Sequence, residues 1–405
     1  MRKLIGIALL AAGIGLPAAF FTIALPGMMR DGGASLMQVG LIYLVWLPSV
    51  LKWLWAPILE RHTAIAAGRR RTTQGLALAL GLCFLPVSVL AESMASGWLL
   101  ALSVLSAALG LSIHLVIAGW CMASLGEAER ARANGYIAAG MVLGGVLGGG
   151  ATPWLALQLG WGPVIAAMAA LIALSGRAGR LLQDAPAVPK RDASPVRLRD
   201  GLAVFSGRRG RLLLPGLVLI ASTGAVDMTL SARLVDAGYR FEAAALILGS
   251  VATLLMAPAS VLSGMAVARW KLRPCFGAIC GLKALVLLAL ALPHGLSREG
   301  IAALAVAEFV LAAALTVVTW QLYMGQPAPG RAMTGFAALT SVDALLRLLL
   351  GIAAGALGAA IGMGALFAAV AVLNVLAALW VISLWQSPAP SGPHPGQSAV
   401  RIPSE

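Results

Sequence analysis

Two residues of opposite charge stand four positions apart inside one of the longest apolar stretches of this chain. Asp343 and Arg347 would lie on one face of a helix, with Asp343 about 11 residues, or ~16 Å, from the nearer end of the stretch. Ionisable groups at such depth in a bilayer are costly and are usually functional. We expect Asp343 to be a proton or substrate site with Arg347 as its counter-charge. The alternative is a local ion pair that only neutralises both groups.

Three more ionisable residues stand inside apolar stretches. Glu308 has no cation near it in the sequence, so it either pairs across a cavity or holds a proton, and we predict it as a second proton-coupling site. Asp227 is nearer the outer end of its stretch, which predicts an external gate or access site. The alternative is a water-exposed carboxylate without a functional role. Lys283 is interpreted as structural.

Lys52 and His114 are candidates with two interpretations each. Lys52 could attract an anionic ligand or bind helix ends across a cytoplasmic gate, or it extends its long stem to the membrane interface six residues away. His114 either titrates near neutral pH or packs as a hydrogen-bonded core residue. We include both among the translocation residues.

Aromatic and amide side chains cluster in the stretches that hold Lys52 and Glu308. Three of them could stack on or hydrogen-bond an aromatic ligand: Tyr43, Trp46 and Gln321. Rings near helix ends usually form an interfacial belt. To that belt we assign Trp53, Trp55 and Tyr323.

Twelve apolar stretches position these residues, and each is long enough to cross a bilayer, since about 20 apolar residues span the ~30 Å hydrocarbon core as a helix. They lie near residues 4–26, 36–58, 74–94, 98–120, 134–157, 160–176, 212–231, 243–266, 275–293, 300–323, 332–355 and 360–385. With 60% hydrophobic and only 11% charged residues, the chain is predicted to be an all-α membrane protein with twelve transmembrane helices.

The net charge of +14 follows the topology of these helices. Taking the amino terminus as cytoplasmic, alternate loops and the two ends hold 22 Lys and Arg residues, and the opposite loops hold four. This bias predicts that both termini are cytoplasmic. No basic and aromatic patch accompanies the charge, so a nucleic-acid partner is not expected.

The four cysteines all lie in or at the ends of apolar stretches, without the pair spacing and histidine partners of a metal site. They are Cys83, Cys121, Cys275 and Cys280. We predict neither a metal nor another cofactor. The first apolar stretch is longer than a signal-peptide core, and we expect it to be retained.

A polar segment divides the stretches six and six. Residues 177–211 are rich in Arg, Asp, Pro and Ser and predict a basic cytoplasmic linker between an amino-terminal bundle (1–176) and a carboxy-terminal bundle (212–386). Residues 387–405 are rich in Pro, Ser and Gly and predict a disordered tail.

The two halves resemble one another weakly. LPGMMRDGGASL from Leu25 aligns with LSARLVDAGYRF from Leu230 at an offset of 205, and LGWGPVIAAM from Leu159 aligns with IGMGALFAAV from Ile361 at an offset of 202. Two similar offsets predict a duplicated six-helix unit. Parallel six-helix halves joined by a cytoplasmic linker are typical of the major facilitator fold, whose site lies between the halves.

The stretch from Leu25 to Arg71 carries a family resemblance. It reads LPGMMRDGGASLMQVGLIYLVWLPSVLKWLWAPILERH and continues to GRRR. It resembles the first two helices of a major facilitator subgroup that contains the muropeptide permease of cell-wall recycling and the permeases for the siderophores pyochelin and rhizobactin. The resemblance implies a cytoplasmic gate loop with Glu60, Arg61, Arg69 and Arg70. The usual acid at this position of the family is Asp, whereas this chain has Glu60, so the family's ion-pair geometry is not carried over to it.

The resemblance implies a monomeric secondary transporter of the bacterial inner membrane, working by alternating access. We predict proton-coupled import of a ferric siderophore, because the chain is too short for the extra helices that muropeptide permeases often carry. Muropeptide import and drug-like efflux are the alternatives. A membrane enzyme or sensor is disfavoured, because acid–base pairs, metal-ligand clusters and a signalling domain are not apparent in the sequence.

Overall fold

The computed structural model describes residues 2–25, 42–63, 68–87, 96–182, 197–224, 226, 229–292, 295–327 and 331–384, and every regular element within them is helical. Several predicted features lie outside these residues. Among them are Asp227, residues 183–196 of the linker, the end of the third stretch, the tail 387–405 and most of the repeated stretch after Leu25.

The first six predicted stretches form helices that are often distorted. The first is α1 (Arg2–Ala19) with the π-helix η1 (Phe20–Ala24). The second is η2 (Ile42–Trp46), α4 (Leu47–Leu51), η3 (Lys52–Leu54) and α5 (Ala56–Thr63). The next are α6 (Gly68–Phe84), α8 (Ser96–Ser124), then α9 (Glu127–Gly145) with η4 (Val146–Ala151) and α10 (Thr152–Leu159), and finally α11 (Trp161–Ser175) with η5 (Gly176–Leu182).

The linker contains α12 (Leu198–Leu202) and η7 (Ala203–Phe205). The later stretches form α13 (Gly207–Ser222) and α14 (Leu230–Asp236), then α15 (Phe241–Leu246) with η8 (Ile247–Ala252) and α16 (Thr253–Trp270). They are followed by α17 (Leu272–Ala291), α18 (Arg298–Met324), α19 (Ala332–Ile361) and α20 (Met363–Leu384).

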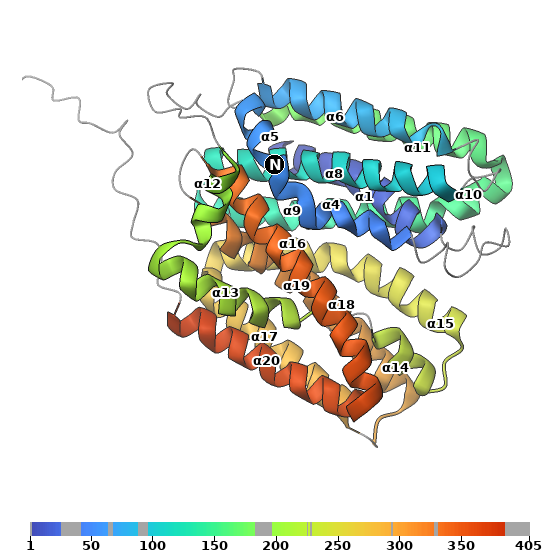
Figure 1. Cartoon of the computed structure of the whole chain (residues 1–405). Coiled ribbons are helices and arrows are strands. Elements are labelled where there is room, and N and C mark those ends of the chain that lie inside the picture. Colours follow the sequence, from blue (N-terminus) through green and yellow to red (C-terminus); the bar gives the residue numbers. More distant parts are fainter. Residues whose placement is uncertain are drawn as a thin grey trace, which may run out of the picture.

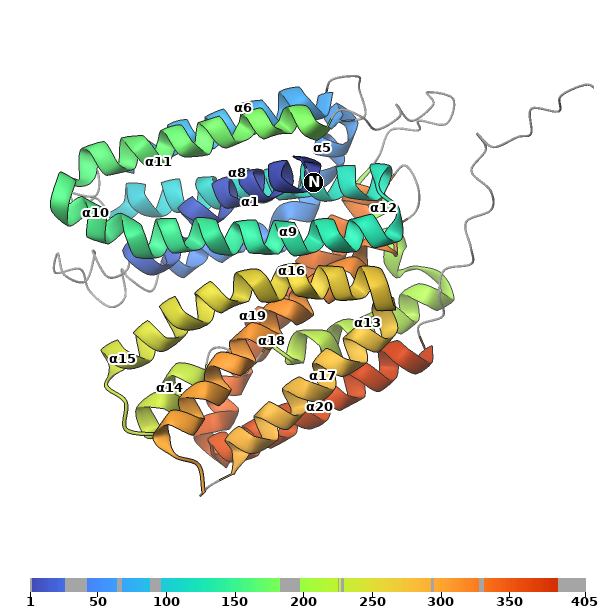
Figure 2. The same ribbon diagram turned by 180° about the vertical axis from the view of Figure 1, so that it is seen from behind.

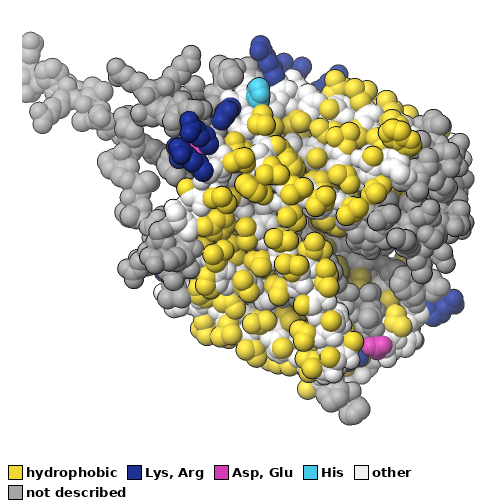
Figure 3. Space-filling model, viewed as in Figure 1, with side chains coloured by type: hydrophobic (Ala, Val, Ile, Leu, Met, Phe, Trp, Pro, Cys, Tyr) yellow, Lys and Arg dark blue, Asp and Glu magenta, His cyan; other side chains and the backbone are white. Residues whose placement is uncertain are grey.

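The molecule has the surface of a membrane protein. Nine of the described helices are long and apolar enough to cross a bilayer, and two shorter apolar helices lie at Leu44–Leu54 and Leu213–Ser222. Figure 3 shows a broad apolar surface with the charged side chains near its ends. Such a surface is stable only where lipid replaces water.

The helices form two bundles, which Figures 1 and 2 show one above the other. The first contains α1, α6, α8, α9 and α11, and the second contains α13, α16, α17, α18 and α20 (Figure 1). Helix α19 follows α18 in the chain, and we count it with the second bundle; it starts against the first bundle and runs obliquely away from it. We call the end where α1 begins and α5, α12 and the start of α19 meet the basic end.

The two bundles touch closely where α9 meets α16. A Cβ atom added to Gly264 would lie 2.5 Å from the carbonyl oxygen of Ala131, and one added to Gly135 would lie 2.6 Å from that of Ser260. Glycine at these positions therefore lets the two backbones approach, as small residues do between membrane helices. At the opposite end Figure 3 shows the surface hollowed between the two bundles.

The seventh predicted stretch, 212–231, is not one helix in the structure. Helix α13 ends at Ser222 and α14 begins at Leu230. The hydroxyls of Thr223 and Thr229 donate to the carbonyl oxygens three residues earlier, at 2.6 and 2.8 Å. Such local hydrogen bonds compete with helix formation, which apolar composition alone does not reveal.

The same tight turn occurs at equivalent points of the two halves. Gly160, between α10 and α11, has φ +82° and ψ 158°, and Gly362, between α19 and α20, has φ +84° and ψ 152°. This backbone region is essentially restricted to glycine. The two glycines occupy matching positions in the repeat LGWGPVIAAM and IGMGALFAAV.

Candidate functional site

A carboxylate lies at the centre of the interface between the bundles. Asp343 on α19 accepts a hydrogen bond from Arg347 Nε at 2.9 Å, one helical turn away, and from the Tyr323 hydroxyl on α18 at 3.2 Å. The Asp343 side chain is 14% exposed and that of Arg347 is 32% exposed. The pair is therefore held in place yet remains accessible to a ligand.

The first bundle contributes a second cation to this carboxylate. Lys52 on η3 is only 6% exposed, and its Nζ donates to the carbonyl oxygen of Thr340 on α19 at 3.5 Å. Lys52 also interacts electrostatically with Asp343. The lysine thus crosses the interface and does not extend to a membrane surface, the alternative considered from the sequence.

His114 on α8 lines the same region. It is buried, and its ring centroid lies 4.8 Å from that of Trp320 on α18 and 6.2 Å from that of Phe336 on α19. Lys52 acts on it electrostatically. We name the group Asp343, Arg347, Lys52, His114 and Tyr323 the central cluster.

The central cluster can exchange partners. Asp343 pairs with Arg347, accepts a hydrogen bond from the Tyr323 hydroxyl and interacts electrostatically with Lys52. Protonation of Asp343 would leave Arg347 and Lys52 without their shared carboxylate, and an anionic ligand group could then take its place. The arrangement therefore suits competition between a proton and an anion.

The break in the seventh stretch makes room for Arg347. A Cβ atom added to Gly224 would lie 2.4 Å from Arg347 Nη1, so the guanidinium rests directly on the backbone at the end of α13. A larger residue here would require the guanidinium to move. This contact places the seventh stretch beside the central cluster.

A second group of contacts closes the basic end. Glu60 on α5 accepts hydrogen bonds from the backbone N–H groups of Met333 and Thr334, both at 3.0 Å, and from the Thr334 hydroxyl. These are free N–H groups in the first turn of α19, where a negative charge is favourable. A carboxylate of one bundle therefore caps a helix of the other.

The linker supports the same helix end. Asp200 on α12 accepts a hydrogen bond at 2.8 Å from Arg331, which directly precedes α19, and another at 2.7 Å from the backbone N–H of Arg197. Burial raises the pKa of Glu60 above its ordinary value, while its hydrogen bonds with Thr334 and Met333 and the charge of Arg331 act in the opposite direction.

The other predicted gate residues lie on α5 and α6. Arg69 and Arg70 lie in the first turn of α6, where the backbone of Arg70 faces Gly179 of η5. Arg61 is exposed at the end of α5. Among the predicted gate residues, Glu60 makes the hydrogen bonds to the first turn of α19.

Gln321 joins the bundles instead of facing a cavity. Its Nε2 donates to the carbonyl oxygen of Glu127 and its Oε1 accepts from Asn134 Nδ2, both at 3.0 Å. Arg130 on the same helix, α9, reaches the carbonyl oxygen of Met324 at 3.4 Å. In this conformation Gln321 therefore binds α9 and not a ligand.

The structure separates the remaining aromatic candidates. Trp46 is 52% exposed on η2, and the side chain of Tyr43 lies outside the described residues. Tyr323, which we assigned to the interfacial belt, is 1% exposed and contacts Asp343. Its place near the end of α18 favoured the belt, and nothing in the sequence shows that α19 passes beside it.

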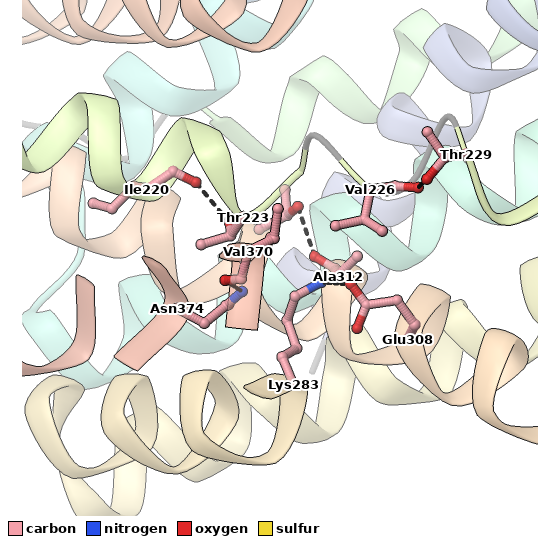
Figure 4. Close-up of polar contacts among 10 residues, drawn as sticks. Ile220, Thr223, Val226, Thr229, Lys283, Glu308, Ala312, Val370 and Asn374 are labelled. Carbon is pink, nitrogen blue, oxygen red and sulfur yellow. Dashed lines mark hydrogen bonds and ion pairs between the residues drawn. The ribbon is translucent and has the colours of Figure 1, made fainter. Parts of the chain in front are cut away.

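Glu308 forms an ion pair inside the second bundle. Lys283 on α17 donates to Glu308 on α18, and both side chains are completely buried. Figure 4 shows the lysine reaching from one helix to the other. The sequence alone does not identify this partner, because the two residues are 25 positions apart and only the packing of α17 on α18 joins them.

Comparison with known proteins gives the family of this chain. The sequence model of the Major Facilitator Superfamily matches residues 5–349. Anhydromuropeptide permease of Escherichia coli is 31% identical over 241 residues, which are 56% of this chain and 48% of that protein. The chain thus spans about half the length of the curated relatives it matches.

Solved structures share the fold. The human organic anion transporter MFSD10 (TETRAN) has a TM-score of 0.72 and 17% identity, with 94% of this chain and 99% of that chain covered. The Escherichia coli fucose:proton symporter FucP has a TM-score of 0.68 and 14% identity, with 94% and 98% covered. The proton:xylose symporter XylE has a TM-score of 0.58 and 15% identity, with 93% and 95% covered. This chain, an all-α multi-pass membrane protein, belongs to the Major Facilitator Superfamily of secondary transporters.

Proposed function

We propose that this transporter imports an anionic solute of the muropeptide class together with protons, acting as a monomer. The observation that carries the proposal is the central cluster, in which Asp343 shares Arg347 and Lys52 between the two bundles. Such a group can exchange a proton for an anionic ligand. The solute class is supported by the 31% identity to anhydromuropeptide permease.

The proposed orientation places the basic end in the cytoplasm, with both termini on that side, because cytoplasmic loops carry the excess of Lys and Arg. The bundles 1–176 and 212–386 would then be joined at the cytoplasmic end and hollowed toward the periplasm. Alternating access would open the cap of Glu60 on α19 and close the opposite end.

A ferric siderophore is the second candidate solute. It is favoured by the resemblance of the stretch from Leu25 to Arg71 to the siderophore permeases. The comparisons with known proteins give this solute no support, and the muropeptide class therefore comes first. Both solutes carry anionic groups that Lys52 and Arg347 could bind.

Uptake into proteoliposomes tests the proposal. We expect labelled anhydromuropeptide, and not ferric pyochelin, to accumulate when a proton gradient is imposed. Asp343→Asn should lower this accumulation about tenfold, a typical coupling between two sites, and leave downhill exchange and thermal unfolding unchanged. Glu299→Gln, which removes an exposed carboxylate in the first turn of α18, is the control.

Three results would contradict parts of the proposal. Accumulation of ferric pyochelin alone would make a ferric siderophore the solute in place of a muropeptide. Equal accumulation without a proton gradient would exclude proton coupling. Unchanged accumulation by Asp343→Asn would remove Asp343 from the mechanism.

A further inference from the structure

An apolar groove of about 730 Å³ runs along the outside of the first bundle. It lies between α1 and the pair α11 and η5, which Figure 2 shows beside one another, and η4 contributes Leu147 to its far end. The groove is separate from the central cluster, and none of the residues discussed above for transport lines it. Its volume is in the range of ligand sites.

Small residues line the groove where α1 approaches α11 and η5, and most of the other apolar lining is leucine. Gly6 and Gly13 of α1 lie so close to Leu181 and Ser175 that an added Cβ atom would come within 2.3 Å of each of those side chains. Leu9 and Leu174 project from the walls and are 55% and 47% exposed. Such a surface fits a hydrocarbon chain.

One end of the groove is strongly cationic. Arg2, Arg177 and Arg180 line it, and its described lining contains no Asp or Glu. Arg177 and Arg180 are three residues apart in the 3-10 helix η5, and side chains at that spacing project from the same side. All three arginines are exposed at the basic end.

The length of the groove matches one leaflet. From Gly6 to Leu16 α1 advances ten residues, or about 15 Å, which is half of the ~30 Å hydrocarbon core. The arginines therefore lie at headgroup depth when the leucines lie at the depth of an acyl chain.

We propose that this groove is a binding site for an anionic phospholipid of the leaflet at the basic end. The lipid phosphate would lie on Arg2, Arg177 and Arg180, and one acyl chain would lie along α1. Basic pockets between membrane helices recognise anionic headgroups in this way. The apolar walls bind any lipid, and the arginines select the anionic one.

Lipid titration of the delipidated full-length protein, followed by native mass spectrometry, tests the site. Dioleoyl-phosphatidylglycerol should bind more tightly than dioleoyl-phosphatidylcholine. Arg177→Gln with Arg180→Gln should weaken the binding of phosphatidylglycerol about 25-fold, from about fivefold for each arginine, and leave the binding of phosphatidylcholine unchanged. The matched control, Arg269→Gln with Lys271→Gln, removes two exposed cations of the same end outside the groove.

A groove-filling variant makes the test independent of charge. Leu174→Trp should weaken the binding of both lipids. Leu285→Trp, at a 65% exposed leucine of α17, should weaken the binding of neither. The proposal is overturned if the two lipids bind equally to the unmodified protein, or if the control pair loses phosphatidylglycerol as strongly as the groove pair. Binding of millimolar inorganic phosphate that depends on the arginines would make free phosphate the ligand. A dimer that is lost in Leu174→Trp would make a second copy of the chain the occupant of the groove.

Discussion

The polar residues inside the bilayer differ in what they face. Asp343 is shared among residues of both bundles and is partly exposed, whereas Glu308 is completely buried with Lys283 inside one bundle. Replacing one member of a buried pair leaves an uncompensated charge, and replacing both by apolar residues can be neutral. The two acids should therefore respond differently to mutation.

We expect Lys283→Met to destabilise the protein by about 3–5 kcal/mol, and the addition of Glu308→Leu to restore most of that loss. Thermal unfolding in detergent measures both. If Glu308 is the second proton-coupling site that its place in an apolar stretch predicts, the stable double variant should exchange solute downhill but not accumulate it. Accumulation at the unmodified level would make Glu308 purely structural.

At the scale of the elements, the glycine turns that join α10 to α11 and α19 to α20 contribute to stability. Gly160→Ala and Gly362→Ala should each cost about 1–3 kcal/mol, because both backbones occupy a region that alanine avoids. Gly162→Ala is the control, since nothing lies within 4 Å of its added Cβ atom and its φ is not positive. Equal melting temperatures for Gly160→Ala and Gly162→Ala would contradict this explanation.

The elements also show what the sequence could predict. Hydropathy and charge were sufficient for the all-α membrane fold, because each span must satisfy its own backbone within lipid. The same pattern could not reveal the break after Ser222, which depends on threonine hydroxyls and on Arg347 resting against Gly224. Pairs such as Glu60 with α19 and Lys283 with Glu308 depend on helix packing, which no spacing in one sequence encodes.

At the scale of the whole molecule, Glu60 makes closure of the basic end sensitive to pH. Burial raises its pKa when the bundles meet, and solvation on opening would return it toward the ordinary 4.5. The closed form then binds the proton more tightly, so closure is favoured as the pH falls toward 4.5 and is lost as the pH rises through the raised pKa.

Spin labels at Ala128 and Trp270, in a cysteine-free background, would report this change as a distance distribution between α9 and α16. The short-distance population should grow as the pH is lowered from neutral, and Glu60→Gln should flatten that dependence. Glu299→Gln should retain it. If the short-distance population of Glu60→Gln still depended on pH, a group other than Glu60 would be responsible for the titration.

Lys52 gives the central cluster one further property. Since its ammonium group comes from one bundle and Asp343 and Arg347 come from the other, moving the bundles apart at the basic end changes the charge that a bound solute experiences. The same movement of the bundles therefore changes both the affinity for the solute and the access of the solute to the basic end. The solute would be bound most weakly when the basic end opens. Its release would therefore need no additional conformational change.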